Sequence, residues 1–159
     1  MDLLAILMNS LWAGLFAGGL GILLTAPPRY SVPALLCGFA GRCVREMFMS
    51  WGMSQNWSTA VAAAVVVLVA VAIIRRHVVS PVVLVSGVLP LGAAVAMFNA
   101  IVELMKVSSL KGEALSVSSV ALSGNMGKVF TTSLAIALGL AAGMAIVRFF
   151  RRDEVQEGV

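Results

Sequence analysis

Long runs of apolar residues, separated by short polar or proline-containing breaks, dominate this chain. Five runs have the length, about 17 to 25 residues or more, that an α-helix needs to cross a hydrocarbon core about 30 Å thick. They are residues 3–25, 32–53, 57–74, 82–105 and 117–150. The breaks contain residues that end helices, such as the prolines at 27–28 and Gly52. The pattern predicts an all-α integral membrane protein with about five transmembrane helices.

The composition indicates the same class of protein. Hydrophobic residues occupy 60% of the 159 positions, charged residues occupy only 11%, and the mean hydropathy is +1.02. Such values are typical of integral membrane proteins rather than of soluble enzymes. The first run has no basic residue before it, so we interpret it as a retained span and not as a secretory signal. We expect one transmembrane domain, residues 1–150, and a short tail, residues 151–159.

The basic residues predict the orientation in the membrane, because cytoplasmic connections carry an excess of Lys and Arg. Six basic residues fall on one side of the predicted spans: Arg29, Arg75, Arg76, Arg148, Arg151 and Arg152. Only Lys106 and Lys111 fall on the other side. We therefore expect the N-terminus outside and the tail in the cytoplasm. The net charge is +4, but the basic residues are scattered at the ends of apolar runs and form no continuous patch, which argues against a nucleic-acid partner.

Three charged residues, Arg42, Arg45 and Glu46, interrupt the second apolar run. A charged side chain in the hydrocarbon region costs at least about 2.5–3.5 kcal/mol, so such residues usually face a bundle interior or a cavity. Their i, i+3 and i+4 spacing places them on one helix face. Arg42 and Glu46 can pair, which leaves Arg45 to bind an anionic ligand. The alternatives are an ion pair between helices without a ligand, or side chains that extend to the membrane surface.

The fourth run contains a proline at position 90. A proline inside a membrane helix removes a backbone hydrogen bond, and such breaks occur where the backbone lines a cavity. Pro90 therefore predicts a broken or kinked helix beside a substrate site, with a simple kink as the alternative. Asn99 and Glu103 follow on a shared face. Asn99 is a candidate for substrate binding, and Glu103 is either a proton carrier or an interfacial residue beside Lys106.

The last run begins with an unusually polar half, which contains Asn125, Lys128 and Thr132. We predict that these three residues line the cavity into which Arg45 points. The alternative for Lys128 is that its long side chain reaches the outer surface of the membrane.

Glycines spaced four apart, at 14 and 18 and at 139 and 143, allow helices to approach closely. We interpret both pairs as sites of packing within the chain, with a dimer interface as the alternative.

Other chemistries find no support in the residues. Cys37 and Cys43 lie six apart in one predicted helix and point in different directions, so we interpret both as packing residues. His77 stands among arginines, without the further ligands that a zinc site needs. A phosphate-binding GxxxxGK[ST] loop and a nucleophile with its base are both missing. We expect no enzyme activity, no metal and no cofactor.

Several short motifs, in their order, resemble a known family. They are Gly41 to Arg45, Gly52, Trp57 to Thr59, Val88 to Pro90 and Lys106 to Ser108. Together they resemble the small membrane subunit of the two-component threonine/serine exporter (ThrE-type) family, which includes succinate-exporting pairs. The chain departs from the family at the break: the pattern Pro-x-x-Pro-Gly is replaced by Pro90 followed by Leu91, Gly92 and two alanines.

The resemblance implies a function and a partner. It implies export of small carboxylates, either threonine and serine or a succinate-like dicarboxylate, driven by protons across a bacterial inner (plasma) membrane. It also implies a larger membrane subunit as partner and supports Arg45, Pro90 and Asn125 as positions at the translocation site. On this hypothesis Arg45 binds the carboxylate, while Arg42 and Glu46 hold it in place or move a proton. The competing hypothesis is a non-transporting assembly or regulatory subunit whose buried charges attach it to a partner.

Overall fold

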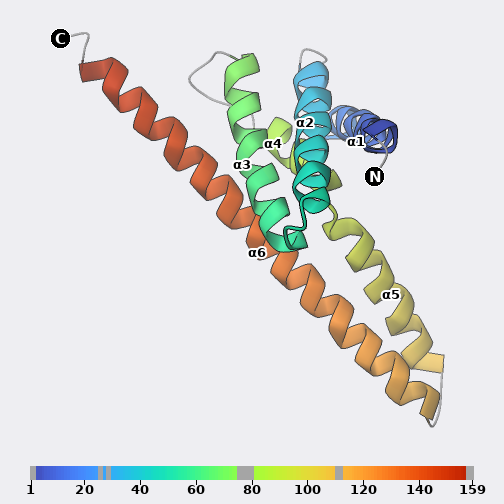
Figure 1. Cartoon of the computed structure of the whole chain (residues 1–159). Helices are drawn as coiled ribbons and strands as arrows, with labels where there is room; N and C mark the ends of the chain where they lie inside the picture. The colour runs from blue at the N-terminus through green and yellow to red at the C-terminus, as the bar shows by residue number, and fades with distance from the viewer. Residues whose placement is uncertain (1–2, 25–26, 28–29, 75–80, 110–112, 157–159) are drawn as a thin grey trace.

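The computed structural model describes residues 3–24, 27, 30–74, 81–109 and 113–156. Every regular element in these ranges is a helix (Figure 1). The elements are α1 (Leu3–Leu23), α2 (Ser31–Ser50), α3 (Gln55–Ile74), α4 (Pro81–Val88), the 3-10 helix η2 (Leu89–Leu91), α5 (Ala93–Ser109) and α6 (Glu113–Gln156). The prediction of an all-α membrane protein is confirmed.

Three of the helices are long and apolar enough to cross a membrane: α1, α3 and α6. Helix α2 has 20 residues, a comparable length, but it carries the three charges described above. The fourth predicted span is divided among α4, η2 and α5. Five crossings and the orientation of the termini stay predictions. Arg29, Arg75, Arg76 and Lys111, on which part of that prediction depends, lie outside the described residues, as does His77.

The end of α2 shows why the chain turns there. Gly52 has a φ of 82°, in the left-handed region that favours glycine. Its N–H donates to the Met49 carbonyl at 3.1 Å, and the Met53 N–H donates to the Phe48 carbonyl at 3.2 Å. These two bonds form a Schellman motif, which satisfies carbonyls that the end of a helix leaves free. The chain can then reverse into α3.

The break in the fourth predicted span lies where the sequence places it. Pro90 has no N–H to donate. At this point the α-helix α4 ends and the single 3-10 turn of η2 follows. Gly92 then ends η2 with a φ of 113°, and α5 begins at the next residue. The broken helix at Pro90 is confirmed.

Helices α1 to α4 and η2 form a bundle, and glycines set its closest contacts. A methyl group on Gly14 would lie 3.0 Å from the Leu35 carbonyl oxygen of α2. On α6, a methyl group on Gly139 would fall against the Ala60 carbonyl of α3, and one on Gly143 would lie 3.0 Å from the Ala64 carbonyl oxygen. The glycine pairs therefore pack helices within the chain, as interpreted from their spacing. The buried core contains Cys37, Ala62, Ala63, Val66, Ala70, Val83, Val88 and Leu91.

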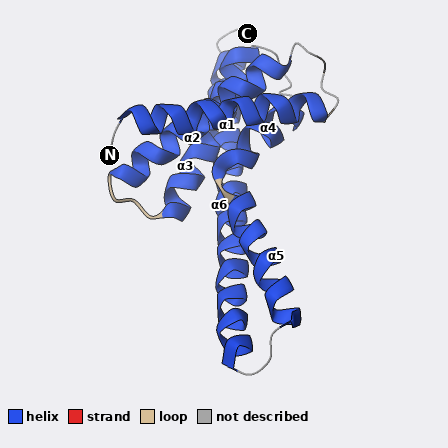
Figure 2. Cartoon of the chain, turned by 90° about the vertical axis from the view of Figure 1, so that its right-hand side faces the viewer, coloured by secondary structure: helices blue, strands red, loops and turns tan. Residues whose placement is uncertain are grey.

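A second region extends away from this bundle. Helix α5 and the N-terminal part of α6 lie side by side and project together from the other helices (Figures 1 and 2). We call this pair the α5–α6 arm. The C-terminal part of α6 instead packs against α3.

The buried residues of α6 share one face of the helix, because they are three, four or fourteen residues apart. They are Ser118, Thr132, Ala135, Gly139 and Gly143. Most other described side chains of α6 are exposed.

Candidate functional site

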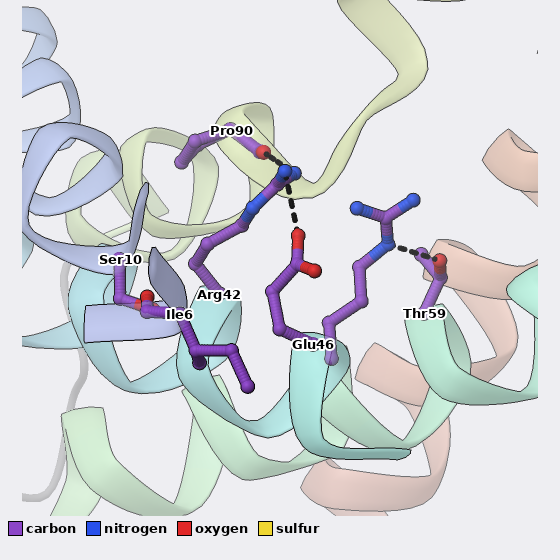
Figure 3. Close-up of polar contacts among 7 residues, drawn as sticks. Ile6, Ser10, Arg42, Glu46, Thr59 and Pro90 are labelled. Carbon is purple, nitrogen blue, oxygen red and sulfur yellow. Dashed lines mark hydrogen bonds and ion pairs between the residues drawn. The ribbon is translucent and has the colours of Figure 1, made fainter. Parts of the chain in front are cut away.

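The three charged residues of α2 lie at the break between α4 and α5. Arg45 and Glu46 are buried, with 5% and 8% of their surface exposed, and Arg42 is partly buried. Figure 3 shows the Arg42 side chain directed toward Pro90 and the Glu46 carboxylate directed toward Arg42. Because i, i+3 and i+4 positions share a helix face, α2 presents all three to the same part of the bundle. The face predicted from the spacing is the face that the structure buries.

Arg42 and Glu46 pair with each other, as the sequence predicts. The Arg42 Nη2 atom lies 2.7 Å from Glu46 Oε1. The other terminal nitrogen of Arg42, Nη1, donates to the Pro90 carbonyl oxygen at 3.5 Å (Figure 3). Arg42 thus compensates the negative charge of Glu46 and also connects α2 to the break.

Arg45 has a different set of neighbours. Its Nε donates to Thr59 Oγ1 of α3 at 3.2 Å (Figure 3). Thr59 donates its own hydrogen to the Gln55 carbonyl at 2.7 Å. The guanidinium lies against Gly92, where an added methyl group would be 3.2 Å from Nη2. Within the described residues Arg45 makes no ion pair. The site therefore contains one positive charge without a counter-ion in this part of the chain, and neither terminal nitrogen makes a hydrogen bond there.

A comparison with models of protein families shows to which family the chain belongs. The family model described as threonine/serine exporter, ThrE, matches residues 9–150. The chain belongs to the threonine/serine exporter (ThrE) family. The match covers both the bundle and the α5–α6 arm, and the family is one of transporters. No curated protein and no solved structure matches the chain.

The other site residues predicted for this ThrE-family chain lie on α5 and α6. Thr132 is buried, Asn125 is half-buried, and Asn99 and Lys128 are exposed. In the described ranges, no hydrogen bond or ion pair joins any of these four to the charged residues of α2. The structure thus brings together Arg42, Arg45, Glu46 and Pro90. The contribution of the α5 and α6 residues to a shared cavity stays a prediction.

Glu103 forms a local ion pair on α5. Its Oε1 accepts a hydrogen bond from Lys106 Nζ at 2.8 Å, and about half of the Lys106 side chain is exposed. Both interpretations of Glu103, as a proton carrier and as an interfacial residue beside Lys106, stay predictions. Glu46 is the more deeply buried of the two proton-coupling candidates, since Glu103 is only half-buried.

Sequence reasoning did not assign a site role to Thr59 or to Gly92. Both contact Arg45 in the structure. A weak signal was present for each: Thr59 is a hydroxyl residue in the polar first part of an apolar helix, and Gly92 comes shortly after a helix-breaking proline. Neither signal names the residue on another helix that would be contacted, so only the folded chain could connect them to Arg45.

The described residues contain no group of three metal-ligating side chains. Both cysteines are free thiols, and Cys37 is buried with its Sγ 3.9 Å from the Val66 carbonyl oxygen. Cys37 thus packs α2 against α3.

Proposed function

We propose that this chain is the small membrane subunit of an exporter for small carboxylates. The substrate is threonine and serine or a succinate-like dicarboxylate, and the driving force is the proton gradient across a bacterial plasma membrane. The chain works with a larger membrane subunit in a hetero-oligomer. Membership of the ThrE family supports transport, and the observation that carries the proposal is the buried Arg45, which makes no ion pair within the described residues.

The chemistry of Arg45 suits a carboxylate. A guanidinium offers parallel N–H groups that match the two oxygens of a carboxylate, and such charge-assisted bonds are roughly twice as strong as neutral ones. Among the residues that the structure describes, Thr59 bonds Nε and none bonds the two terminal nitrogens, which remain for a ligand. An unpaired charge in a low-dielectric interior is costly, and an anionic substrate would lower that cost.

Glu46 is the proposed coupling group. Its carboxylate is bound to Arg42, and Arg42 also bonds the Pro90 carbonyl. Protonation of Glu46 would remove the charge that holds Arg42 and would change the contact between α2 and the break. A coupled exporter requires an ion whose binding differs between its two conformations, and this pair offers such a difference.

The partner subunit would cover part of the α5–α6 arm. Lys128 is exposed on the arm, and within the described residues it has no ion pair. A charged group that faced hydrocarbon would be costly. A larger subunit that shields Lys128, Asn125 and Asn99 would complete the substrate path from the Arg45 side.

The test compares Arg45→Ala with Arg148→Ala in inside-out membrane vesicles that contain the full-length chain and its native partners. Arg148 is an exposed arginine near the end of α6 and serves as the control. We expect Arg45→Ala to abolish uptake of labelled threonine, serine and succinate, and Arg148→Ala to leave it within about twofold, because surface charges contribute little. Unchanged uptake in Arg45→Ala would refute the proposal. Loss of co-purification with the larger subunit, with normal kinetics in any complex that remains, would instead support the assembly role.

A further inference from the structure

Gly92 makes an unusual contact with Arg45. It ends η2 with φ 113° and ψ −2°, a left-handed conformation that other residues adopt with strain. The three atoms nearest to an added Cβ all belong to the Arg45 guanidinium: Nη2 at 3.2 Å, Cζ at 3.4 Å and Nη1 at 3.5 Å. The flat guanidinium therefore lies over the place where any other residue would carry its side chain.

Two neighbours define the place of the Arg45 guanidinium. Thr59 of α3 accepts the Nε hydrogen, and the terminal part of the group lies where a side chain at position 92 would be. A planar group that is bonded at one edge and seated in a space of its own shape loses much of its rotational freedom before a ligand arrives. Such preorganisation raises affinity because less freedom is lost on binding.

We infer that Gly92 is the positioning residue of the anion site, and that its missing side chain decides where Arg45 can present its two terminal nitrogens to a carboxylate. This inference rests on the proposed role of Arg45. The short segment that contains Gly92 also bonds Arg42 through the Pro90 carbonyl, so its position affects both arginines.

The chain contains a matched control for the glycine itself. Gly52 also has a positive φ, 82°, and ends a helix, but a Cβ at this position would meet nothing within 4 Å. Substitution of Gly52 by Ala adds backbone strain alone. Substitution of Gly92 adds similar strain together with a methyl group that pushes on the guanidinium. The difference between the two variants isolates the contact with Arg45.

The experiment measures KM and maximal rate for labelled threonine, serine and succinate in inside-out vesicles. The variants are Gly92→Ala, Gly52→Ala, Arg45→Lys and the double variant Gly92→Ala with Arg45→Lys. We expect Gly92→Ala to raise KM about tenfold or more with a smaller change in maximal rate, and Gly52→Ala to change KM by less than about twofold. In the Arg45→Lys background, Gly92→Ala should have less than about a twofold further effect on KM, because a lysine has no planar group over Gly92.

Equal KM values for Gly92→Ala and Gly52→Ala would overturn the inference, as would full additivity in the double variant. If Gly92→Ala does not accumulate in the membrane, Gly92→Asn is measured against Gly52→Asn, since Asn tolerates a positive φ better than Ala does. Normal transport by Arg45→Ala would refute the proposed function itself, which is a separate result.

Discussion

The bundle and the α5–α6 arm use similar residues in different ways. In the bundle, small side chains let helices approach closely, and three charged residues are enclosed with their partners on α3 and at the break. In the arm, two helices contact each other along one seam and leave most of their side chains exposed. Helix α6 belongs to both regions, because its C-terminal part packs against α3.

The two ion pairs of the described residues show what this difference means. Arg42 and Glu46 pair in the bundle with 24% and 11% of their side chains exposed, whereas Lys106 and Glu103 pair on the arm with 53% and 18% exposed. Both pairs are local to one helix. An ion pair enclosed in the bundle persists only with good geometry and is costly to break, while a surface pair contributes little. The enclosed pair is therefore the better marker of function.

The largest expected contrast comes from removing the acid of each pair. Glu46→Ala would leave Arg42 partly buried without the counter-ion that it has in the described residues. We expect the free energy of unfolding to fall by about 3 kcal/mol, the lower end of the range for a buried pair, because Arg42 keeps some exposure. Glu103→Ala should cost about 0.5 kcal/mol. Thermal unfolding of the purified full-length variants in detergent measures both. Equal losses would show that the bundle does not enclose its charges more tightly than the arm does.

A smaller contrast is expected from two glycines of α6. Gly139→Ala would place a methyl group against the Ala60 carbonyl and separate α6 from α3, which should cost about 2 kcal/mol. Gly124→Ala is the control on the arm, because nothing lies within 4 Å of its added Cβ. It should be neutral or stabilising by up to about 1 kcal/mol, since Ala favours helix. Thermal unfolding again provides the measurement, and destabilisation by Gly124→Ala would reveal a contact on the arm that the single chain does not contain.

The smallest contrast compares two threonines. Thr59→Val removes the acceptor for Arg45 Nε and should cost about 1.5 kcal/mol, as for hydrogen bonds to charged groups, together with a several-fold rise in substrate KM. Thr131 is exposed on α6 and bonds the Gly127 carbonyl of its own helix at 3.0 Å, so Thr131→Val should cost less than about 0.5 kcal/mol. Vesicle uptake and thermal unfolding test the pair. An unchanged KM in Thr59→Val would argue that Thr59 does not orient Arg45.

Local features of the site were predictable from the sequence. The Arg42–Glu46 pair depends on four-residue spacing within one helix, and the break depends on the missing N–H of Pro90. The contact of Arg45 with Thr59 was not predictable, because it joins residues 14 positions apart on different helices. The continuation of α6 to Gln156, beyond the predicted end of the last apolar run, also exceeds what hydropathy alone indicates.

The sequence by itself determined the membrane class, the helices, the face of α2 that carries the charges and the resemblance to the ThrE family, because each of these depends on composition, on short-range periodicity or on motifs in order. Only the tertiary structure decided which residues surround Arg45. Arg42 finds its counter-ion one turn away on its own helix, whereas the neighbours of Arg45 come from α3 and from the turn at Gly92. Contacts between helices depend on how whole elements pack, and that packing brings Thr59 and Gly92 to Arg45.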